Sequence, residues 1–121
     1  ALAQSDYRII LTTDHGSIRA TNAIKVVGDK NTNTNLRYKL GKNLSYNPKE
    51  VMEIKDPAKA MLPSPNLSTT YVFATGADFF AYPNNYNYYV QYYRDTFQHG
   101  GISMEEMIIP LVTLRPKRPR T

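Results

Sequence analysis

The segment Tyr7–Thr13 (YRIILTT) constrains the fold most, because its centre is a continuous run of Ile and Leu. Such a run is typical of a strand that is buried on both faces. Sheets of this kind belong mainly to α/β proteins, in which helices cover the two sides. The chain of 121 residues is long enough for one domain with a modest core. The first segment therefore predicts a strand inside an α/β sheet.

Four further segments have the alternating, or β-branched and aromatic, composition of strands. They are Ala20–Gly28, Thr69–Thr75, Asp78–Pro83 and Ile108–Leu114. Leu36–Leu40 follows the turn-rich run Asp29–Asn35, and this order predicts the return strand of a hairpin. Pro110 favours an edge position or a bulge for the last strand, because proline has no N–H to donate.

Two short helices are predicted by their capping residues. Asn47 fits an N-cap, with Pro48 at the first helical position and Glu50 at the third. Ser103 and Glu106 have the S-x-x-E spacing of a capping box, which predicts that a helix begins at Ser103. The alternation of short strands and short helices again favours the α/β class.

The chain contains no cysteine, which excludes disulfides, thiolate zinc sites and a cysteine nucleophile. No apolar run approaches the roughly 18 residues of a membrane-spanning helix, and there is no signal-peptide pattern. We therefore expect a cytoplasmic protein with no membrane partner.

The chain is basic, with a formal net charge of +5 and a sequence pI near 9.5. Four of its fifteen basic residues lie in the tail, residues 115–121. Excess positive charge favours phosphate-bearing partners, including nucleic acid bound by the tail and the basic loop. A solvated surface with a frayed tail is the simpler explanation.

Tyrosines are concentrated in Asn85–Arg94 (NYNYYVQYYR), which holds five of the ten. Aromatic rings beside an arginine can stack on bases, but Tyr more often packs its ring and leaves its hydroxyl in water. Whether this stretch is a helix or an extended loop stays open. Arg94, together with Arg37 and Lys39, is also a candidate for contact with a substrate phosphate; a solvated or structural role is the alternative.

Asp14 and His15 directly follow the first strand, at the kind of strand end where open α/β sheets bind ligands. A carboxylate oxygen with an imidazole nitrogen suits zinc, and Gly16 lets the backbone turn away from the pair. A simple turn with an exposed histidine is the alternative.

The second histidine of the chain, His99, also lies in a glycine-rich turn, immediately before a predicted helix. Gly100 and Gly101 allow the backbone to approach a ligand or a metal closely. Asp14, His15 and His99 are therefore candidate metal ligands, provided that their strands are neighbours. The alternative for His99 is a C-cap turn in which the histidine is incidental.

The DHG turn after an apolar strand, paired with HGGISMEEMIIPL at 99–111, resembles the C-terminal half of the alkaline phosphatase superfamily, and within it PglZ-type domains. Residues 71–117 and the run TNLRYKLGKNL at 34–44 are most similar to the PglZ domain of response regulators that join it to a receiver domain and regulate type IX secretion. The resemblance covers nearly the whole chain.

The resemblance implies a reaction and a set of metal ligands. The superfamily hydrolyses phosphoric esters with two metal ions, usually zinc, and a Ser or Thr nucleophile. Asp14 and His15 match the pair that holds the second ion, and His99 matches a ligand of the first. Two such ions activate the nucleophilic oxygen and neutralise phosphoryl charge. The expected substrates are phosphodiesters, among them nucleotides, and a response regulator implies a sensor kinase as a partner.

In the family, the nucleophile and the other metal ligands precede the DHG strand, whereas thirteen residues precede Asp14 here. Thr12 and Thr13 do not stand in the nucleophile's place, and we interpret them as strand-end residues. We therefore expect an α/β fragment. Residues 1–114 would form the C-terminal part of an alkaline phosphatase-like sheet with flanking helices, residues 115–121 a basic tail, and the fragment would hold no catalytic residue and be inactive by itself.

The first strand should be central in the complete sheet, so that in this chain its apolar faces and edges lack partners. We expect such a chain to self-associate or to pair with the absent N-terminal segment. The alternative to a hydrolase is a non-catalytic regulatory module that keeps the fold and binds protein or nucleic acid.

Overall fold

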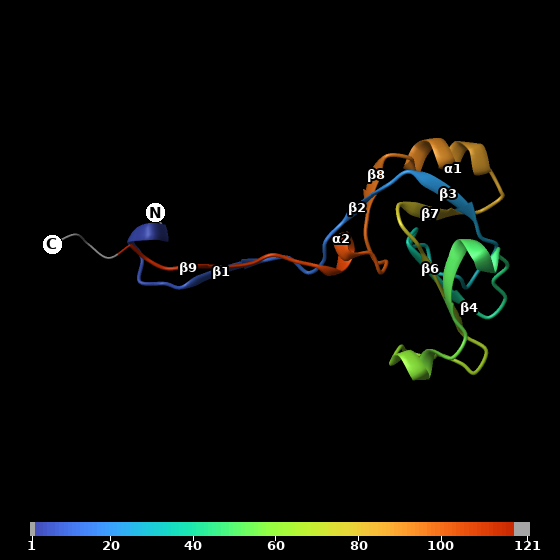
Figure 1. The fold of residues 1–121 in the computed structure, drawn as a ribbon, viewed down its shortest axis with the longest axis horizontal. Helices are drawn as coiled ribbons and strands as arrows, with labels where there is room; N and C mark the ends of the chain where they lie inside the picture. The colour runs from blue at the N-terminus through green and yellow to red at the C-terminus, as the bar shows by residue number, and fades with distance from the viewer. Residues whose placement is uncertain (1, 118–121) are drawn as a thin grey trace.

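The computed structural model describes residues 2–117 and is mixed α/β, with short strands and few helices. Figure 1 shows two parts: a head, and a long arm that projects from it and carries the first and last described residues at its far end. The arm is a single antiparallel pair, in which β1 (Ile9–Thr12) lies against β9 (Leu111–Leu114). Within residues 2–117, no helix has the length and apolar character needed to cross a bilayer.

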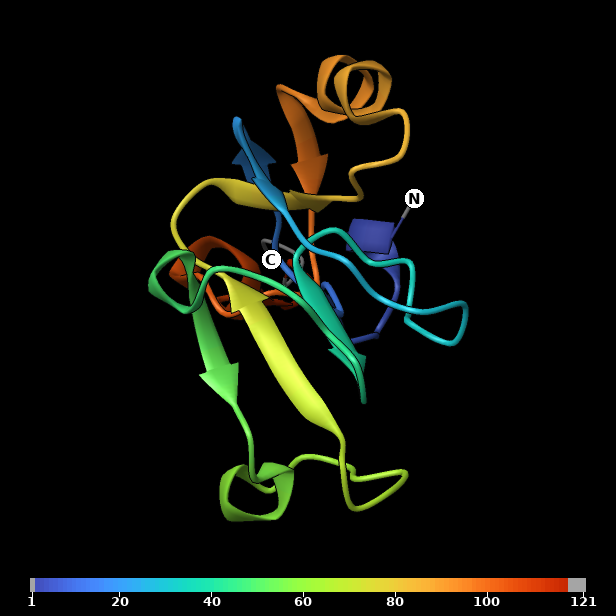
Figure 2. The ribbon, with the colours of Figure 1, turned by 90° about the vertical axis from the view of Figure 1, so that its right-hand side faces the viewer.

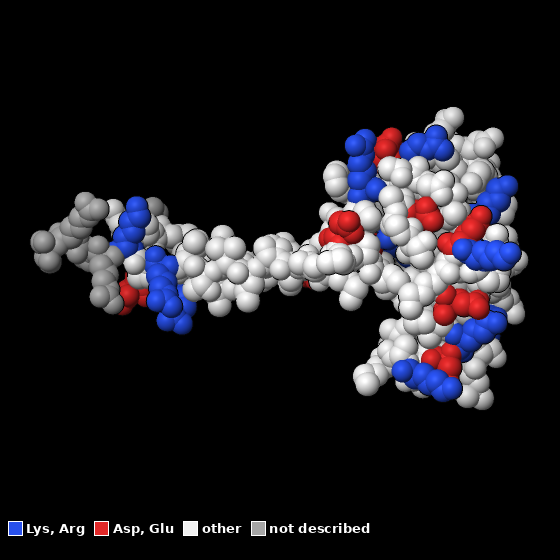
Figure 3. Space-filling view, in the orientation of Figure 1, with Lys and Arg blue, Asp and Glu red and all other residues white. Residues whose placement is uncertain are grey.

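The arm is apolar and exposed. Ile10 on β1 is 59% exposed and Leu111 on β9 is 74% exposed, and no residue of either strand is buried. Figure 3 shows the middle of the arm without charge on the face drawn, while Lys and Arg gather at its tip and on the head. A strand at Tyr7–Thr13 is thus confirmed, but its predicted burial is wrong for this chain, since only one neighbouring strand is present among the described residues.

The head is built around a three-stranded antiparallel sheet with the order β4-β6-β5, seen side by side in Figure 2. These strands are β4 (Tyr38–Gly41), β5 (Val51–Ile54) and β6 (Thr70–Ala74). The central strand β6 is buried over Tyr71–Ala74. The strand predicted at Thr69–Thr75 is thus confirmed as β6. It lies in the middle of the sheet because it pairs with a strand on each of its two edges.

Two strand pairs connect this sheet to the arm. β3 (Asn22–Lys25) lies parallel to β7 (Asp78–Ala81), and β2 (Ile18–Ala20) lies antiparallel to β8 (Thr96–Gln98). The core consists of buried apolar side chains from β3, β6, β7 and the residue after β3, namely Ile24, Val26, Val72, Ala74 and Phe80. The predicted strand at Ala20–Gly28 is therefore two strands, which separate at Thr21 because β2 and β3 pair with different partners.

Two predictions for the middle of the chain need correction. Leu36–Leu40 overlaps β4, but β4 pairs with β6 and makes no hairpin with the preceding strand. Asn47 does cap a helix, its side chain accepting from the Lys49 N–H, yet this 3-10 helix, η2 (Pro48–Glu50), ends after one turn. The chain continues directly into β5, because the free edge of β6 is available for pairing.

The remaining helices are short. They are the 3-10 turns η1 (Leu2–Gln4) and η3 (Pro57–Ala60), and the α-helices α1 (Tyr86–Tyr93) and α2 (Met104–Met107). The tyrosine-rich stretch is thus helical, and its rings stack along one side at the helical spacing, Tyr88 on Tyr92 and Tyr89 on Tyr93. The capping box that predicted α2 is confirmed. Of the predicted tail, residues 118–121 lie outside the described residues.

Candidate metal centre

Two turns that are far apart in sequence meet where the arm joins the head. The DHG turn, Asp14–Gly16, connects β1 to β2, and the HGG turn, His99–Gly101, follows β8. The register of the β2–β8 pair sets Ile18 opposite Gln98. Because the strands are antiparallel, the residues before Ile18 and those after Gln98 continue side by side, and the two turns come together.

The two histidines of the chain stack on each other. The ring centroids of His15 and His99 are 3.6 Å apart and the ring planes differ by 10°. His99 is exposed and the side chain of His15 is 40% exposed, so that both rings are open to a ligand from solvent. The structure thus brings the two histidines among the three proposed metal ligands together.

The hydrogen bonding of His15 fixes its tautomer. The Nδ1 atom of His15 lies 2.6 Å from the carbonyl oxygen of Gly16. A carbonyl oxygen can only accept, so Nδ1 carries the proton and the Nε2 lone pair is free. Metal-binding histidines commonly use this arrangement, in which one ring nitrogen donates to the backbone while the other faces the ion.

Asp14 provides a second electron-pair donor beside that nitrogen. Its Oδ1 lies 3.5 Å from His15 Nε2, and its side chain is 91% exposed. Two ligands of a tetrahedral zinc ion, each about 2.0–2.1 Å from the metal, are separated by about 3.3 Å. The spacing of Asp14 and His15 therefore fits one metal cation bound by both side chains. It also fits an ion pair between Asp14 and a His15 ring that carries a second proton.

The described residues do not supply a full coordination shell. Within residues 2–117, no group of three or more His, Cys, Asp or Glu side chains is arranged to hold a metal ion. Asp14 and His15 offer two ligand atoms of the types that zinc prefers, and His99 offers a third from the neighbouring turn. A closed zinc site here needs ligands in addition to these.

A buried ion pair lies beneath the two turns. Arg37, fully buried just before β4, donates from Nε and Nη2 to the two carboxylate oxygens of Glu106 on α2, at 2.9 and 3.0 Å. Arg37 also donates from Nη1 to the backbone carbonyl of Asp78. Arg37, predicted as a phosphate contact, therefore has its guanidinium occupied inside the protein.

Glu106 accepts several further hydrogen bonds. The backbone N–H groups of Gly101 and Ser103 and the Ser103 hydroxyl all donate to its carboxylate. Burial raises the pKa of Glu106, but the hydrogen bonds from Arg37, Ser103 and Gly101 outweigh burial and leave the pKa below its ordinary value. The sequence pattern identified Glu106 as a member of a capping box; no signal in the sequence indicated that Arg37 is its partner.

The glycines of both turns are explained by this ion pair and by α2. A Cβ on Gly101 would lie 2.6 Å from Glu106 Oε2, and a Cβ on Gly16 would collide with the carbonyl oxygen of Glu105. Gly100 has φ +102°, a conformation that favours glycine. These glycines thus permit close approach within the protein. The sequence had suggested a backbone turn at Gly16, and a close approach to a ligand or a metal at Gly100 and Gly101.

The other two cations proposed for phosphate binding have different environments. Lys39 is 2% exposed, donates from Nζ to the Asn33 carbonyl at 2.8 Å and lies above the Tyr82 ring. Burial lowers the pKa of Lys39 to about 8. Arg94, at the C-terminal end of α1, is exposed.

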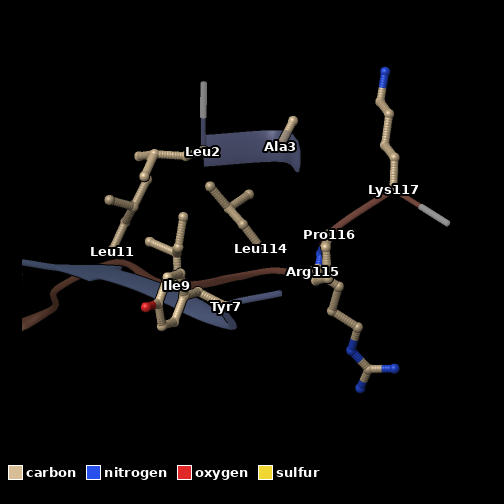
Figure 4. A pocket seen from close by; sticks show the side chains of 9 residues that line it. All are labelled: Leu2, Ala3, Tyr7, Ile9, Leu11, Leu114, Arg115, Pro116 and Lys117. Carbon is tan, nitrogen blue, oxygen red and sulfur yellow. The ribbon is translucent and has the colours of Figure 1, made fainter. Parts of the chain in front are cut away.

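The tip of the arm contains an apolar hollow of about 390 Å³. Figure 4 shows Ile9, Leu11 and Leu114 extending toward η1, while the Arg115 and Lys117 side chains point away. No candidate metal ligand lines this hollow, which consists of Leu2, Ala3, Tyr7, Ile9, Leu11, Leu114, Arg115, Pro116 and Lys117.

Comparison with known families gives one result. Residues 1–114 match the family model described as the BREX system PglZ alkaline phosphatase-like domain. The comparison with curated proteins finds no match. The matched span contains both histidine turns and both strands of the arm, and it indicates a phosphoesterase-type domain.

Proposed function

Because the chain belongs to the PglZ family of alkaline phosphatase-like domains, we propose that it forms part of a zinc-dependent phosphoric-ester hydrolase that acts on phosphodiesters. One observation carries the zinc requirement: His15 and His99 stack at 3.6 Å, with the free Nε2 of His15 facing Asp14 Oδ1.

In this proposal Asp14 and His15 hold one zinc ion and His99 contributes to a second. Zinc bound there would supply Lewis-acid stabilisation of the charge on the phosphoryl group. The protein's own part is to fix the His15 tautomer through the Gly16 carbonyl, so that Nε2 is the ring nitrogen that faces the ion. Nucleotides and oligonucleotides are the favoured phosphodiesters, because the chain carries a net charge of +5.

The nucleophile lies outside the described residues in this proposal. The Thr12 hydroxyl donates to the Pro110 carbonyl at 2.8 Å, and the Thr13 hydroxyl donates to the His15 carbonyl at 2.9 Å. Both hydroxyls therefore support the base of the arm and the DHG turn. For phosphate binding we favour Arg94, because Arg37 and Lys39 are buried and already bonded.

The arm supports a larger sheet around this site. Both strands expose apolar side chains on both faces, and their outer edges pair with no strand among residues 2–117. We propose that β1 and β9 lie inside the sheet of the complete domain, next to the segment that carries the nucleophile. Self-association of this chain through the same edges is the competing arrangement.

For the whole protein we propose a PorX-like cytoplasmic response regulator that acts with a sensor kinase and controls type IX secretion. The support is the resemblance of 71–117 and 34–44 to that group. A non-catalytic regulatory module that binds protein or nucleic acid is the second candidate, and the exposed apolar arm favours protein as its partner.

The test uses the full-length protein and a generic phosphodiester, bis(p-nitrophenyl) phosphate. Hydrolysis should need added zinc after chelation, and should fall at least about 100-fold in Asp14→Ala and in His99→Ala, because each removes a metal ligand. Asp56→Ala is the matched control, since its exposed carboxylate makes no cap hydrogen bond. Wild-type rates in both ligand variants would refute the assignment of these residues.

A further inference from the structure

The buried Arg37–Glu106 pair connects to both histidine turns, and this position gives it a second role. We infer that Arg37, Glu106 and Asn35 are positioning residues, which hold His15 and His99 side by side and thereby set the zinc affinity of the site. The inference rests on the proposed zinc-binding function and adds residues that are not themselves ligands.

The connection to the DHG turn runs through the backbone of Glu106. The N–H of Gly16 donates to the Glu106 carbonyl at 2.8 Å, and the Gly16 carbonyl in turn accepts from His15 Nδ1. The carboxylate of Glu106 is held by Arg37, Ser103 and Gly101, so its backbone has little freedom to move. Two hydrogen bonds therefore connect the His15 ring to Glu106: one from His15 to Gly16, and one from Gly16 to the Glu106 backbone. The orientation of the ring depends on the ion pair through these two bonds.

The connection to the HGG turn is made twice. The Gly101 N–H donates directly to Glu106 Oε1 at 3.0 Å. The Asn35 side chain donates from Nδ2 to the His99 carbonyl at 3.1 Å, and its Oδ1 accepts from the Arg37 N–H at 2.7 Å. The His99 carbonyl and the N–H of Gly101, two residues further on, are thus both bonded to the same small network.

The network has few ways to adjust. Arg37 and Glu106 are 0% and 4% exposed, so that removing the charge of either partner leaves the other buried without compensation. Residues that orient metal ligands typically change metal affinity by 10–100-fold when they are replaced. The ion pair is therefore expected to affect the histidines even though it does not contact the ion.

The decisive variant is Glu106→Gln, with Glu105→Gln as its control. Glu105 is the adjacent residue on α2, is exposed and undergoes the same change of charge. Two readouts are needed in the full chain: the dissociation constant for zinc alone, from calorimetry, and the imidazole NMR signals of His15 and His99 without metal. The stacked rings shift each other's signals, so the second readout reports their separation directly.

We expect Glu106→Gln to weaken zinc binding about 10–100-fold and to move both histidine signals, while Glu105→Gln changes neither. A folded Glu106→Gln protein with wild-type zinc affinity and unchanged histidine signals would overturn the inference. If Glu106→Gln does not fold, Asn35→Ala decides by the same two readouts, because it leaves the ion pair in place. If the wild type binds no zinc, the proposed function fails, and the histidine signals alone still decide whether the network positions the rings.

Discussion

The backbone N–H of Gly16 donates to the carbonyl oxygen of Glu106 across 2.8 Å, which packs the DHG turn directly against α2. Gly16 is not among the described residues with positive φ, so glycine is required here for close approach and not for its conformational freedom. The contact joins the turn after β1 to α2, and with it the two halves of the candidate metal centre.

Replacing this glycine should be costly. Gly16→Ala places a Cβ against the Glu105 carbonyl oxygen, and we expect it to lower the free energy of unfolding by about 3 kcal/mol. Gly76→Ala is the comparison, since Gly76 has φ +51° but no atom within 4 Å of the added Cβ, and should cost about 1–2 kcal/mol. Urea unfolding measures both, and equal costs would contradict the steric explanation.

Acid should weaken the protein through Glu106. Its pKa is lowered in the folded state, so its stabilising contribution is present above the ordinary value of 4.5 and is lost as the pH falls through the folded pKa. Urea unfolding from pH 7 to pH 3 should therefore show a loss of stability that is smaller in Glu106→Gln. Parallel curves for the two proteins would exclude Glu106 as the source.

Lys39 should give a trend of the same direction, a stability that rises with pH, in mild alkali. Burial lowers its pKa from 10.5 to about 8, so between these values the unfolded chain binds more protons than the folded one. Stability contributed by this residue then rises with pH across that window. We expect the difference in unfolding free energy between wild type and Lys39→Met to grow from pH 7.5 to pH 9.5, and a constant difference would contradict the lowered pKa.

The exposed arm should tolerate charge. Leu111→Lys changes a β9 side chain that is 74% exposed, and we expect it to alter the free energy of unfolding by less than about 0.5 kcal/mol. Phe80→Ala is the comparison in the core of the head. Phe80 is 1% exposed, and its replacement should lower the free energy of unfolding by about 3–5 kcal/mol. If the arm mediates self-association, sedimentation velocity should show a larger fraction of monomer for Leu111→Lys than for wild type.

The sequence predicted individual strands and helices better than it predicted which strands pair with each other. The strand at Thr69–Thr75 and the helix beginning at Ser103 were found from local signals, a β-branched and aromatic run and a capping box. β5 was missed, because Val51–Ile54 becomes a strand only by pairing with the free edge of β6. Pairing between distant segments is set by tertiary contacts, which a local pattern does not contain.

The same distinction applies to the site. The spacing of Asp14, His15 and His99 beside glycines was visible in the sequence, and the structure stacks the two histidines. The partnership of Arg37 with Glu106 was not visible, since the two residues are joined only by the folded head. A buried arginine and an exposed one look alike in a single sequence, and for this reason a phosphate contact and a structural role both stayed open for Arg37.

The arm also determines the order in which this chain can fold. β1 and β9 come from opposite ends of the chain, so their pairing closes nearly the longest loop available. Contacts of such wide sequence separation form slowly unless other structure first brings the ends together. The head can provide that structure through β2 and β8, whose pairing delivers the two histidine turns to each other. The His15–His99 stack is therefore expected to form late in folding, after the head has assembled and together with the closing of the arm.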